Sequence, residues 1–381
     1  MSDFFIPPVN TIGSGAVKQV GDKLKSLGAK KPLLVTDKGI TAIGVTDQVV
    51  GYIKAAGLDV VVYDETVPNP TDKNVVDGLA VFQKSGTDSI VSLGGGSSHD
   101  CAKGIGILVG NGGNIRDYAG IDQLSKPMPP FVAINTTAGT ASEMTRFAVI
   151  TNTEIHVKMV MADWRVTPNF SINDPDLMIG MPPALTAATG MDALTHAVEA
   201  YVSIAANPIT DACALMSIDL IAKYLRKAVA RGTDIEAREQ MAYAQFLAGM
   251  AFNSVGLGYV HAMAHQPGSF LNLPHGVCNA ILLPHVCTFN LNAAIERFAT
   301  IAEHLGVKTC CLSARDAAIA GIEAIKTLSA DVAIPANLTV LGVKESDLQI
   351  MAENAQKDVC ALTNPRTAKL EEIIGIYKNA L

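Results

Sequence analysis

The sequence predicts an α/β domain with an open, mostly parallel sheet, followed by an all-α domain. Short β-branched runs alternate with amphipathic stretches in the first part of the chain, and strand signals nearly vanish after Pro182. The 381 residues are enough for two hydrophobic cores. Hydrophobic residues make up 49% and charged residues 17%, a composition typical of compact globular proteins. We expect the boundary near residues 181–185, with domains spanning 1–183 and 184–381.

The predicted elements of the first domain follow each other in strand–helix order. Apolar β-branched runs indicate buried parallel strands, at 31–36, 58–64, 88–94 and 130–135. Amphipathic stretches indicate helices, at 17–29, 45–57 and 73–86, and two of them end at Gly-Ala or Gly-Leu, as helix C-termini often do. Residues 147–172 look strand-rich but irregular, with runs at 147–151, 156–161 and 169–173. Alternation at this spacing predicts an open α/β sheet.

The second domain is predicted to be a long series of helices. Ala, Leu, Met and Glu dominate the segments 182–202, 216–230, 237–252, 293–306 and 314–330. These residues have high helix propensity, and few β-branched runs interrupt them. The sequence therefore predicts an all-α second domain.

Composition and patterning exclude several classes of protein. The longest apolar runs are broken by Gly, Asn or Pro before ~18 residues, so no membrane span is expected. The N-terminal segment lacks a basic stretch followed by an apolar one, so no secretory signal is expected. Seven cysteines, an odd number, are scattered along the chain, with only Cys310 and Cys311 adjacent, which favours reduced thiols in the cytoplasm. A net charge of −7 argues against nucleic acid as a partner.

A glycine-rich segment, VSLGGGSSHDCAKGIG, connects a predicted strand to a predicted helix. Gly94, Gly95 and Gly96 allow a close approach of the backbone to an anion, and Ser97 and Ser98 add hydroxyl groups. The free N–H groups of the following helix N-terminus would point at a phosphate. The segment matches neither the usual dinucleotide glycine pattern nor a Walker motif. A simple glycine turn is the alternative interpretation.

Polar residues follow two other predicted strands. Thr136, Thr137, Thr140 and Thr145, in the segment INTTAGTASEMT, are candidates for hydrogen bonds to a cofactor, although threonine also caps helices routinely. Asp37 ends the strand LLVTD, where a carboxylate suits a ribose 2′-hydroxyl and repels a 2′-phosphate. Asp is also a common turn former after a strand.

The strongest metal-binding signal is one carboxylate and three histidines in two distant segments. Asp192 and His196 lie four residues apart in a predicted helix and therefore share one face. His261 and His265 repeat that spacing, and His275 follows in Pro-His-Gly. Asp192, His196, His261 and His275 suit a divalent first-row metal with one position open for substrate. A satisfied core or surface histidine is the alternative at each position.

Neighbouring residues modify this hypothesis. The spacing HAMAH resembles a zinc-protease motif, but Ala262 stands where the catalytic Glu would be. Glu199 lies one turn after His196 and is a candidate to orient it, with a solvent salt bridge as the alternative. Three cysteines lie in or near these motifs: Cys101, Cys278 and Cys360. We expect them to pack as small buried hydrophobic side chains, which is the usual role of a free cysteine.

Four motifs in this order carry a resemblance to a known family: GGGSSHDCAKG, TTAGTASEMT, TAATGMDALTHAVEAYV and HAMAH followed by PHG. The chain resembles the iron-containing (group III) alcohol dehydrogenases over nearly its whole length. Within that family it is most similar to the NAD-dependent methanol and 1,3-propanediol dehydrogenases. The resemblance implies a dehydroquinate synthase-like fold, with a Rossmann-like nucleotide-binding domain, a helical catalytic domain and an active site in the cleft between them.

The resemblance also implies roles for individual residues. The family's metal ligands fall on Asp192, His196, His261 and His275, and His265 matches a histidine near the nicotinamide. The implied cofactor positions are Asp37, Asn69, Gly94, Gly95, Gly96, Ser97, Asp100, Lys103, Thr136, Thr140, Thr145 and Lys158. One departure is Pro267, which is expected to end or bend the helix that carries His261 and His265.

The implied reaction is a reversible hydride transfer between a small primary alcohol and NAD. A metal would polarise the substrate oxygen, and His265 is the candidate proton relay, with a structural role as its alternative. The resemblance favours Fe²⁺, while the donor set also accepts Zn²⁺, Mn²⁺ or Ni²⁺. A dimer or larger homo-oligomer is implied. Two alternative functions are less consistent with the sequence. A dehydroquinate synthase-like lyase would need Lys and Arg around the metal, and the motifs of the helical domain lack them. A non-catalytic scaffold that only binds NAD or metal is disfavoured because all four expected ligands are present.

Overall fold

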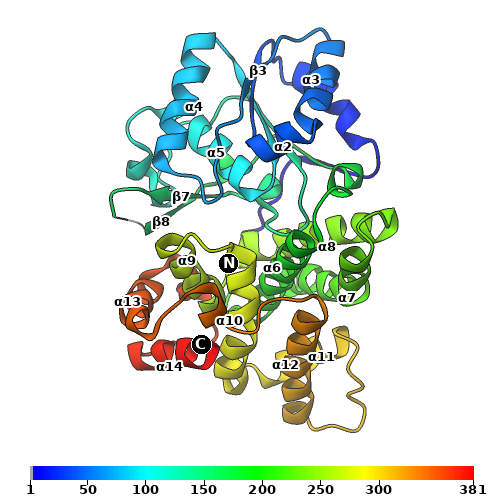
Figure 1. Ribbon diagram of the computed structural model, residues 1–381, viewed down its shortest axis with the longest axis vertical. Coiled ribbons are helices and arrows are strands. Elements are labelled where there is room, and N and C mark those ends of the chain that lie inside the picture. The colour runs from blue at the N-terminus through cyan, green and yellow to red at the C-terminus, as the bar shows by residue number, and fades with distance from the viewer. Residues whose placement is uncertain (1–2, 156) are drawn as a thin grey trace. The chain divides into compact units, whose positions relative to one another are not determined.

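The computed structural model describes residues 3–155 and 157–381, and it divides the chain into two compact units (Figure 1). The α/β unit contains residues 5–137 and 141–179. Among the described residues, the helical unit contains residues 180–381, the short segment 138–140 and residues 3–4. His156, where one strand was expected to begin, lies outside the described residues, as do the first two residues of the chain.

The α/β unit is built on a six-stranded, fully parallel sheet with the strand order β1-β9-β6-β4-β2-β3. In that order the strands are Val9–Ile12, Phe170–Asn173, Phe131–Asn135, Ser89–Gly94, Pro32–Val35 and Val61–Tyr63. Every residue of β2, β4 and β6 is buried, as expected for strands covered on both faces. The expected strands at 31–36, 58–64, 88–94, 130–135 and 169–173 are therefore confirmed, with shorter bounds.

Helices cover both faces of this sheet because neighbouring strand residues point to opposite sides. Leu33 and Val35 of β2 belong to a core shared with α4 (Asp72–Ser85) and α5 (Gly96–Asn111). Leu34, between them, belongs to a second core shared with α1 (Val20–Ser26) and α3 (Val45–Ala55). The short helix α2 (Lys38–Ala42) follows β2 directly.

A second, smaller sheet completes the α/β unit. It has the order β5-β8-β7, where β7 (Phe147–Asn152) pairs antiparallel with β8 (Val157–Ala162) and β5 (Gly120–Ile121) lies at its edge. Short 3-10 turns complete the connections, at Ala16–Gln19, Ile115–Tyr118, Ser142–Met144, Trp164–Val166 and Pro175–Met178.

The helical unit contains no strand among its described residues, in agreement with the expected all-α domain. Its helices are α6 (Pro183–Val202), α7 (Pro208–Ala230), α8 (Ile235–Val255), α9 (Tyr259–Phe270), α10 (His275–Asn290), α11 (Ile295–His304), α12 (Ala314–Asp331), α13 (Leu348–Lys357) and α14 (Leu370–Ala380). Short 3-10 turns lie at Leu291–Ala293, Thr339–Leu341, Glu345–Asp347 and Val359–Thr363. From Gly190 to Val202 every residue of α6 is buried, which makes α6 the central helix of this unit.

Pro267 was expected to end or bend helix α9, and it does not end it. The helix continues three residues beyond the proline, to Phe270. Proline lacks the N–H that would bond to the carbonyl of Met263, one turn earlier. The hydroxyl of Tyr377, on α14, donates to that carbonyl at 2.7 Å instead. A side chain from a distant helix thus satisfies the backbone group that Pro267 leaves open.

None of the helices in the described part of the chain is long and apolar enough to cross a membrane.

Candidate active site

The helical unit brings three of the four expected metal ligands together. Asp192 lies on α6, His261 on α9, and His275 is the first residue of α10. The Nε2 atoms of His261 and His275 lie 3.8 and 3.7 Å from the same oxygen, Oδ1 of Asp192. All three candidate ligand atoms lie within 4.8 Å of one another. One carboxylate and two imidazoles with this spacing form a donor set suited to a divalent metal.

His196 occupies the flank of this cluster. Its ring stacks on the ring of His261, with the centroids 4.5 Å apart, and on Phe252 at 4.3 Å. Burial lowers the pKa of His196 to about 4, so its imidazole is neutral. It therefore lies beside the three converging groups and has the protonation state that a ligand needs.

The Asn279 carboxamide shows where the donor atoms converge. Its Nδ2 lies 2.7 Å from Oδ1 of Asp192, 3.0 Å from Nε2 of His261 and 3.1 Å from Nε2 of His275. The amide NH₂ has only two hydrogens for these three atoms, so one carboxylate oxygen and two imidazole nitrogens converge on a point that the amide alone does not satisfy. This arrangement fits a cation. Asn279 lies one helical turn after His275, but nothing in the sequence distinguishes it from other buried amides.

Glu199 orients His261 and not His196, so the expectation for this carboxylate is corrected. Its Oε2 lies 2.6 Å from Nδ1 of His261, and its Oε1 accepts the backbone N–H of Val260 at 2.7 Å. Burial raises the pKa of Glu199 to about 8. When Nδ1 of His261 carries the shared proton, the lone pair of Nε2 faces Asp192. The spacing in the sequence indicated His196, on the same helix, as the partner of Glu199. In the folded unit Glu199 contacts His261, on α9, instead.

His265 forms a buried pair with Asp358. Its Nδ1 lies 2.7 Å from Oδ2 of Asp358, whose other oxygen, Oδ1, accepts the backbone N–H of Cys360 at 2.9 Å. Burial alone would raise the pKa of Asp358, but His265 and these hydrogen bonds outweigh burial and hold it below its ordinary value. The ring of His265 stacks on that of His275 at 5.4 Å. Asp358 was not expected from the sequence, because it follows His265 by 93 residues without any motif.

In the α/β unit, the carboxyl ends of three neighbouring strands carry the expected phosphate and ribose positions. Strands β6, β4 and β2 are adjacent and parallel, so their C-terminal turns lie side by side at one edge of the sheet. This edge is where open α/β sheets bind ligands. The turns hold Thr136 and Thr137 after β6, Gly94–Ser97 after β4, and Asp37 after β2.

The glycine turn requires glycine at its first position. Gly94 has φ +144°, and a Cβ there would lie 2.5 Å from Oγ of Ser98. Asp37 lies beside this turn, since its Oδ2 is 3.4 Å from the same hydroxyl. Its other oxygen, Oδ1, accepts the N–H groups of Gly39 and Ile40 and caps α2. Asp37 is therefore a helix cap with one oxygen directed at the glycine turn.

Lys103 and Asp100 lie beneath the loop that carries Thr145. The fully buried ammonium group of Lys103 donates to the carbonyls of Ser142, Thr145 and Phe147 at 2.7, 2.9 and 2.6 Å. Asp100 accepts the hydroxyl of Ser142 at 2.7 Å. Burial lowers the pKa of Lys103 to about 8. These contacts make Lys103 and Asp100 supports of the loop at residues 142–147.

The remaining expected cofactor residues are more dispersed. Asn69 lies in the connection before α4 with a left-handed backbone, φ 52°. Lys158 lies on β8. Burial raises the pKa of Asp100, and the positive charge of Lys158 acts in the opposite direction. Thr140 belongs to the segment 138–140 of the helical unit.

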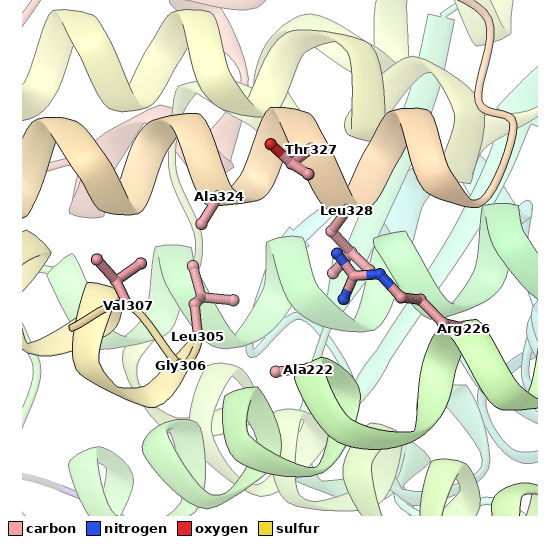
Figure 2. Close-up of a pocket in the computed structure, with 8 residues that line it drawn as sticks. All are labelled: Ala222, Arg226, Leu305, Gly306, Val307, Ala324, Thr327 and Leu328. Atoms are coloured by element: carbon pink, nitrogen blue, oxygen red, sulfur yellow. The ribbon is translucent and has the colours of Figure 1, made fainter.

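A separate pocket of about 250 Å³ lies among α7, the end of α11 and α12 (Figure 2). Its lining is apolar except for Arg226 and Thr327, and Arg226 pairs with Asp331 at 2.7 Å. None of the clustered histidines lines it. The pocket therefore lacks the reactive groups found at the candidate active site.

Comparisons with known proteins agree with the geometry. The model of the iron-containing alcohol dehydrogenases matches residues 7–175, and the model of the C-terminal part of the Fe-containing alcohol dehydrogenase family matches residues 186–381. The chain is 57% identical over 382 residues to 1,3-propanediol dehydrogenase of Citrobacter freundii, covering 100% of this chain and 99% of that one. It is 51% identical to NAD-dependent methanol dehydrogenase of Bacillus methanolicus, with both chains fully covered.

Solved structures give the same result. A crystal structure of 1,3-propanediol oxidoreductase superposes with a TM-score of 0.98 at 56% identity, and an alcohol dehydrogenase from Oenococcus oeni with 0.98 at 49%. Each alignment covers 100% of both chains. The resemblance inferred from the four sequence motifs is thereby confirmed. The chain belongs to the iron-containing alcohol dehydrogenase family and is an oxidoreductase of alcohols and aldehydes.

Proposed function

We propose that this enzyme interconverts small primary alcohols and their aldehydes with NAD, using a divalent metal held by Asp192, His196, His261 and His275. The convergence of three ligand atoms on one point carries the proposal. Fe²⁺ is favoured by family membership, and the donor set also accepts Zn²⁺, Mn²⁺ or Ni²⁺. A bound metal would supply Lewis acidity at the substrate oxygen.

The residues around this site would keep the reacting groups oriented. Glu199 holds the ring of His261 through Nδ1, and Phe252 packs against the ring of His196. His265 would take the alcohol proton at Nε2, because its Nδ1 is held by Asp358. Asp358 stabilises the imidazolium form that results. This pair gives the released proton a defined acceptor.

The edge of the sheet formed by β6, β4 and β2 would hold the dinucleotide. The glycine turn and the N-terminus of α5 suit the pyrophosphate, since free N–H groups attract anions. Asp37 would bind the ribose hydroxyls and repel a 2′-phosphate, which favours NAD over NADP. Bound NAD would accept the hydride. The proposed cofactor set is completed by Asn69, Thr136, Thr137, Thr140, Thr145 and Lys158, together with Asp100 and Lys103, which would act through the loop at residues 142–147 that they support.

We also propose a nucleotide-binding domain at 1–183, a catalytic domain at 184–381, and a cytoplasmic homo-oligomer, a dimer or larger. Relatives named for methanol and 1,3-propanediol support a small alcohol as substrate. The odd number of scattered cysteines supports a reducing compartment. Light scattering on the purified full chain measures the oligomeric state.

The deciding experiment is NADH formation by metal-stripped protein, measured anaerobically with a panel of primary alcohols. Fe²⁺, Zn²⁺ or Mn²⁺ is added back separately, and NADP⁺ replaces NAD⁺ in a parallel series. We expect turnover only with metal, and much faster turnover with NAD⁺. The absence of metal-dependent turnover on every alcohol would exclude this function and favour a lyase of the same fold.

A further inference from the structure

Two adjacent thiols form a second, chemically different cluster in the helical unit. Cys310 and Cys311 occupy the central positions of the turn Thr309–Leu312, between α11 and α12, where the N–H of Leu312 donates to the carbonyl of Thr309 at 2.9 Å. Both side chains are exposed, and their Sγ atoms lie 3.8 Å apart. The two sulfur atoms are thus presented to solvent as a pair.

The turn is anchored at both ends. The hydroxyl of Thr309 donates to Oε1 of Glu303, on α11, at 2.9 Å. On the other side, Ser313 caps α12 by accepting the N–H of Asp316 at 3.1 Å. Because both flanks are fixed, bringing the two thiols together costs little additional conformational entropy on binding.

The spacing of the chain disfavours a disulfide between these cysteines. The Cα atoms of adjacent residues are about 3.8 Å apart across a trans peptide. Unstrained disulfides join Cα atoms that are about 4.4–6.8 Å apart. Chelation by both sulfur atoms needs no S–S bond and therefore no such distortion. The spacing therefore favours the dithiol form, with both sulfur atoms 3.8 Å apart.

We propose that Cys310 and Cys311 form a binding site for a soft, thiophilic centre, namely a trivalent arsenical. Thiolate sulfur selects soft centres, whereas the imidazole and carboxylate donors at Asp192 select borderline metals. In the reaction, two As–O bonds of R-As(OH)₂ break and two As–S bonds form. The two thiol protons leave with the two hydroxyl groups as water, so nothing is oxidised or reduced. This site is independent of the proposed dehydrogenase chemistry.

The test uses phenylarsine oxide as the probe on the full-length protein with its thiols reduced. Intact mass spectrometry should show one phenylarsenic group bound with the loss of two titratable thiols. An excess of a monothiol should leave it bound, and a dithiol such as 2,3-dimercaptopropanol should remove it. Cys310→Ser and Cys311→Ser should each weaken binding by about 10²-fold, since one-point attachment loses the chelate effect.

Cys213→Ser is the matched control, because Cys213 is a single, half-buried cysteine on α7. It should bind the probe as the wild type does. Circular dichroism spectra of all three variants establish that the fold is intact. Wild-type protein from which a monothiol strips the arsenical, or a Cys310→Ser variant that retains it, would overturn the proposal.

Discussion

At the residue scale, Glu199 shows how one buried carboxylate controls a candidate ligand. It contacts Nδ1 of His261 at 2.6 Å, while Nε2 of the same ring faces Asp192. Partners of this kind, one step removed from a metal, typically change metal affinity by about 10–100-fold when removed. The cluster therefore depends on a residue that is not itself expected to touch the metal.

We predict that Glu199→Gln lowers metal affinity by about 10–100-fold, because a glutamine amide can either donate to Nδ1 of His261 or accept from it and so no longer favours one tautomer of the ring. Competition of Zn²⁺ with a chromophoric chelator measures this affinity directly. Glu323→Gln is the control, since the exposed carboxylate of Glu323 pairs with Lys326, far along the chain from the proposed ligands. Equal affinity in Glu199→Gln and wild type would contradict the orienting role.

The pair of His265 and Asp358 gives a second prediction at this scale. His265→Ala and Asp358→Asn should each slow turnover by about 10²-fold or more, the usual contribution of general acid–base catalysis, with metal content unchanged. The double variant should be little slower than either single one, because both residues serve one proton path. Steady-state rates and metal analysis of the three variants measure this. Fully additive effects would indicate separate roles.

At the element scale, helix α9 depends on a contact from outside itself. Pro267 leaves the carbonyl of Met263 without its helical N–H partner, and Tyr377 supplies a hydroxyl at 2.7 Å. A sequence contains the proline but does not reveal the compensating tyrosine, which follows Met263 by 114 residues. This explains why the sequence pointed to an end or bend where the helix continues.

We therefore predict that Tyr377→Phe destabilises the fold by about 1–3 kcal/mol, the usual effect of a buried acceptor that loses its donor. In a Pro267→Ala background the same substitution should cost less, since alanine restores the backbone N–H that bonds to the carbonyl of Met263. Urea unfolding of the four proteins in this cycle gives the coupling energy. An unchanged effect of Tyr377→Phe in the alanine background would refute the compensation.

The loop at residues 142–147 is another element supported from beneath. The buried ammonium group of Lys103 donates to three of its carbonyl groups, so the shape of the loop is fixed by a residue of α5. Lysine is the only side chain that carries three N–H donors on a single atom, and burying its ammonium group costs desolvation free energy. The support of this loop is therefore linked to the protonation of Lys103.

Burial of Lys103 consequently makes stability depend on pH. Its pKa is lowered to about 8 in the fold, against 10.5 for the ordinary side chain. Between these values the unfolded chain binds the extra proton, so raising the pH favours the folded state. The free energy of unfolding of wild type, relative to Lys103→Met, should therefore increase from pH 8 towards pH 10.5. Urea titrations at several pH values measure this difference, and a difference independent of pH would contradict the assignment.

At the scale of the whole molecule, the sequence predicted features that depend on neighbouring residues better than features that depend on long-range contacts. The parallel strands, the glycine turn and the helical second half each follow from runs of about 5–20 neighbouring residues. The four-residue spacing of Asp192 and His196 placed two donors on one helix face. The edge strand Val9–Ile12 was not anticipated, because it is short and partly exposed. Asp358 reaches His265 only through tertiary packing, and so do the contacts of Asn279 with Asp192 and His261.

We expect the two units to be protected from hydrogen exchange by different ligands, the helical unit by the metal and the α/β unit by the dinucleotide. Anything that binds the folded state stabilises it by mass action, and the protection is largest in the elements that contact the ligand. Added Zn²⁺ should therefore slow amide hydrogen exchange in α6, α9 and α10, which carry the histidine cluster. Added NADH should instead protect the turns after β2, β4 and β6 and the loop at 142–147.

Hydrogen exchange with mass spectrometry on the metal-stripped protein, with each ligand added singly, resolves the two patterns. A His275→Ala variant should lose the Zn²⁺ response in the helical unit and retain the NADH response in the α/β unit. Protection of the glycine turn by Zn²⁺ alone, or of α10 by Zn²⁺ in His275→Ala, would place the metal elsewhere than at Asp192 and its neighbours. The experiment locates each ligand without requiring turnover, so it separates binding from catalysis.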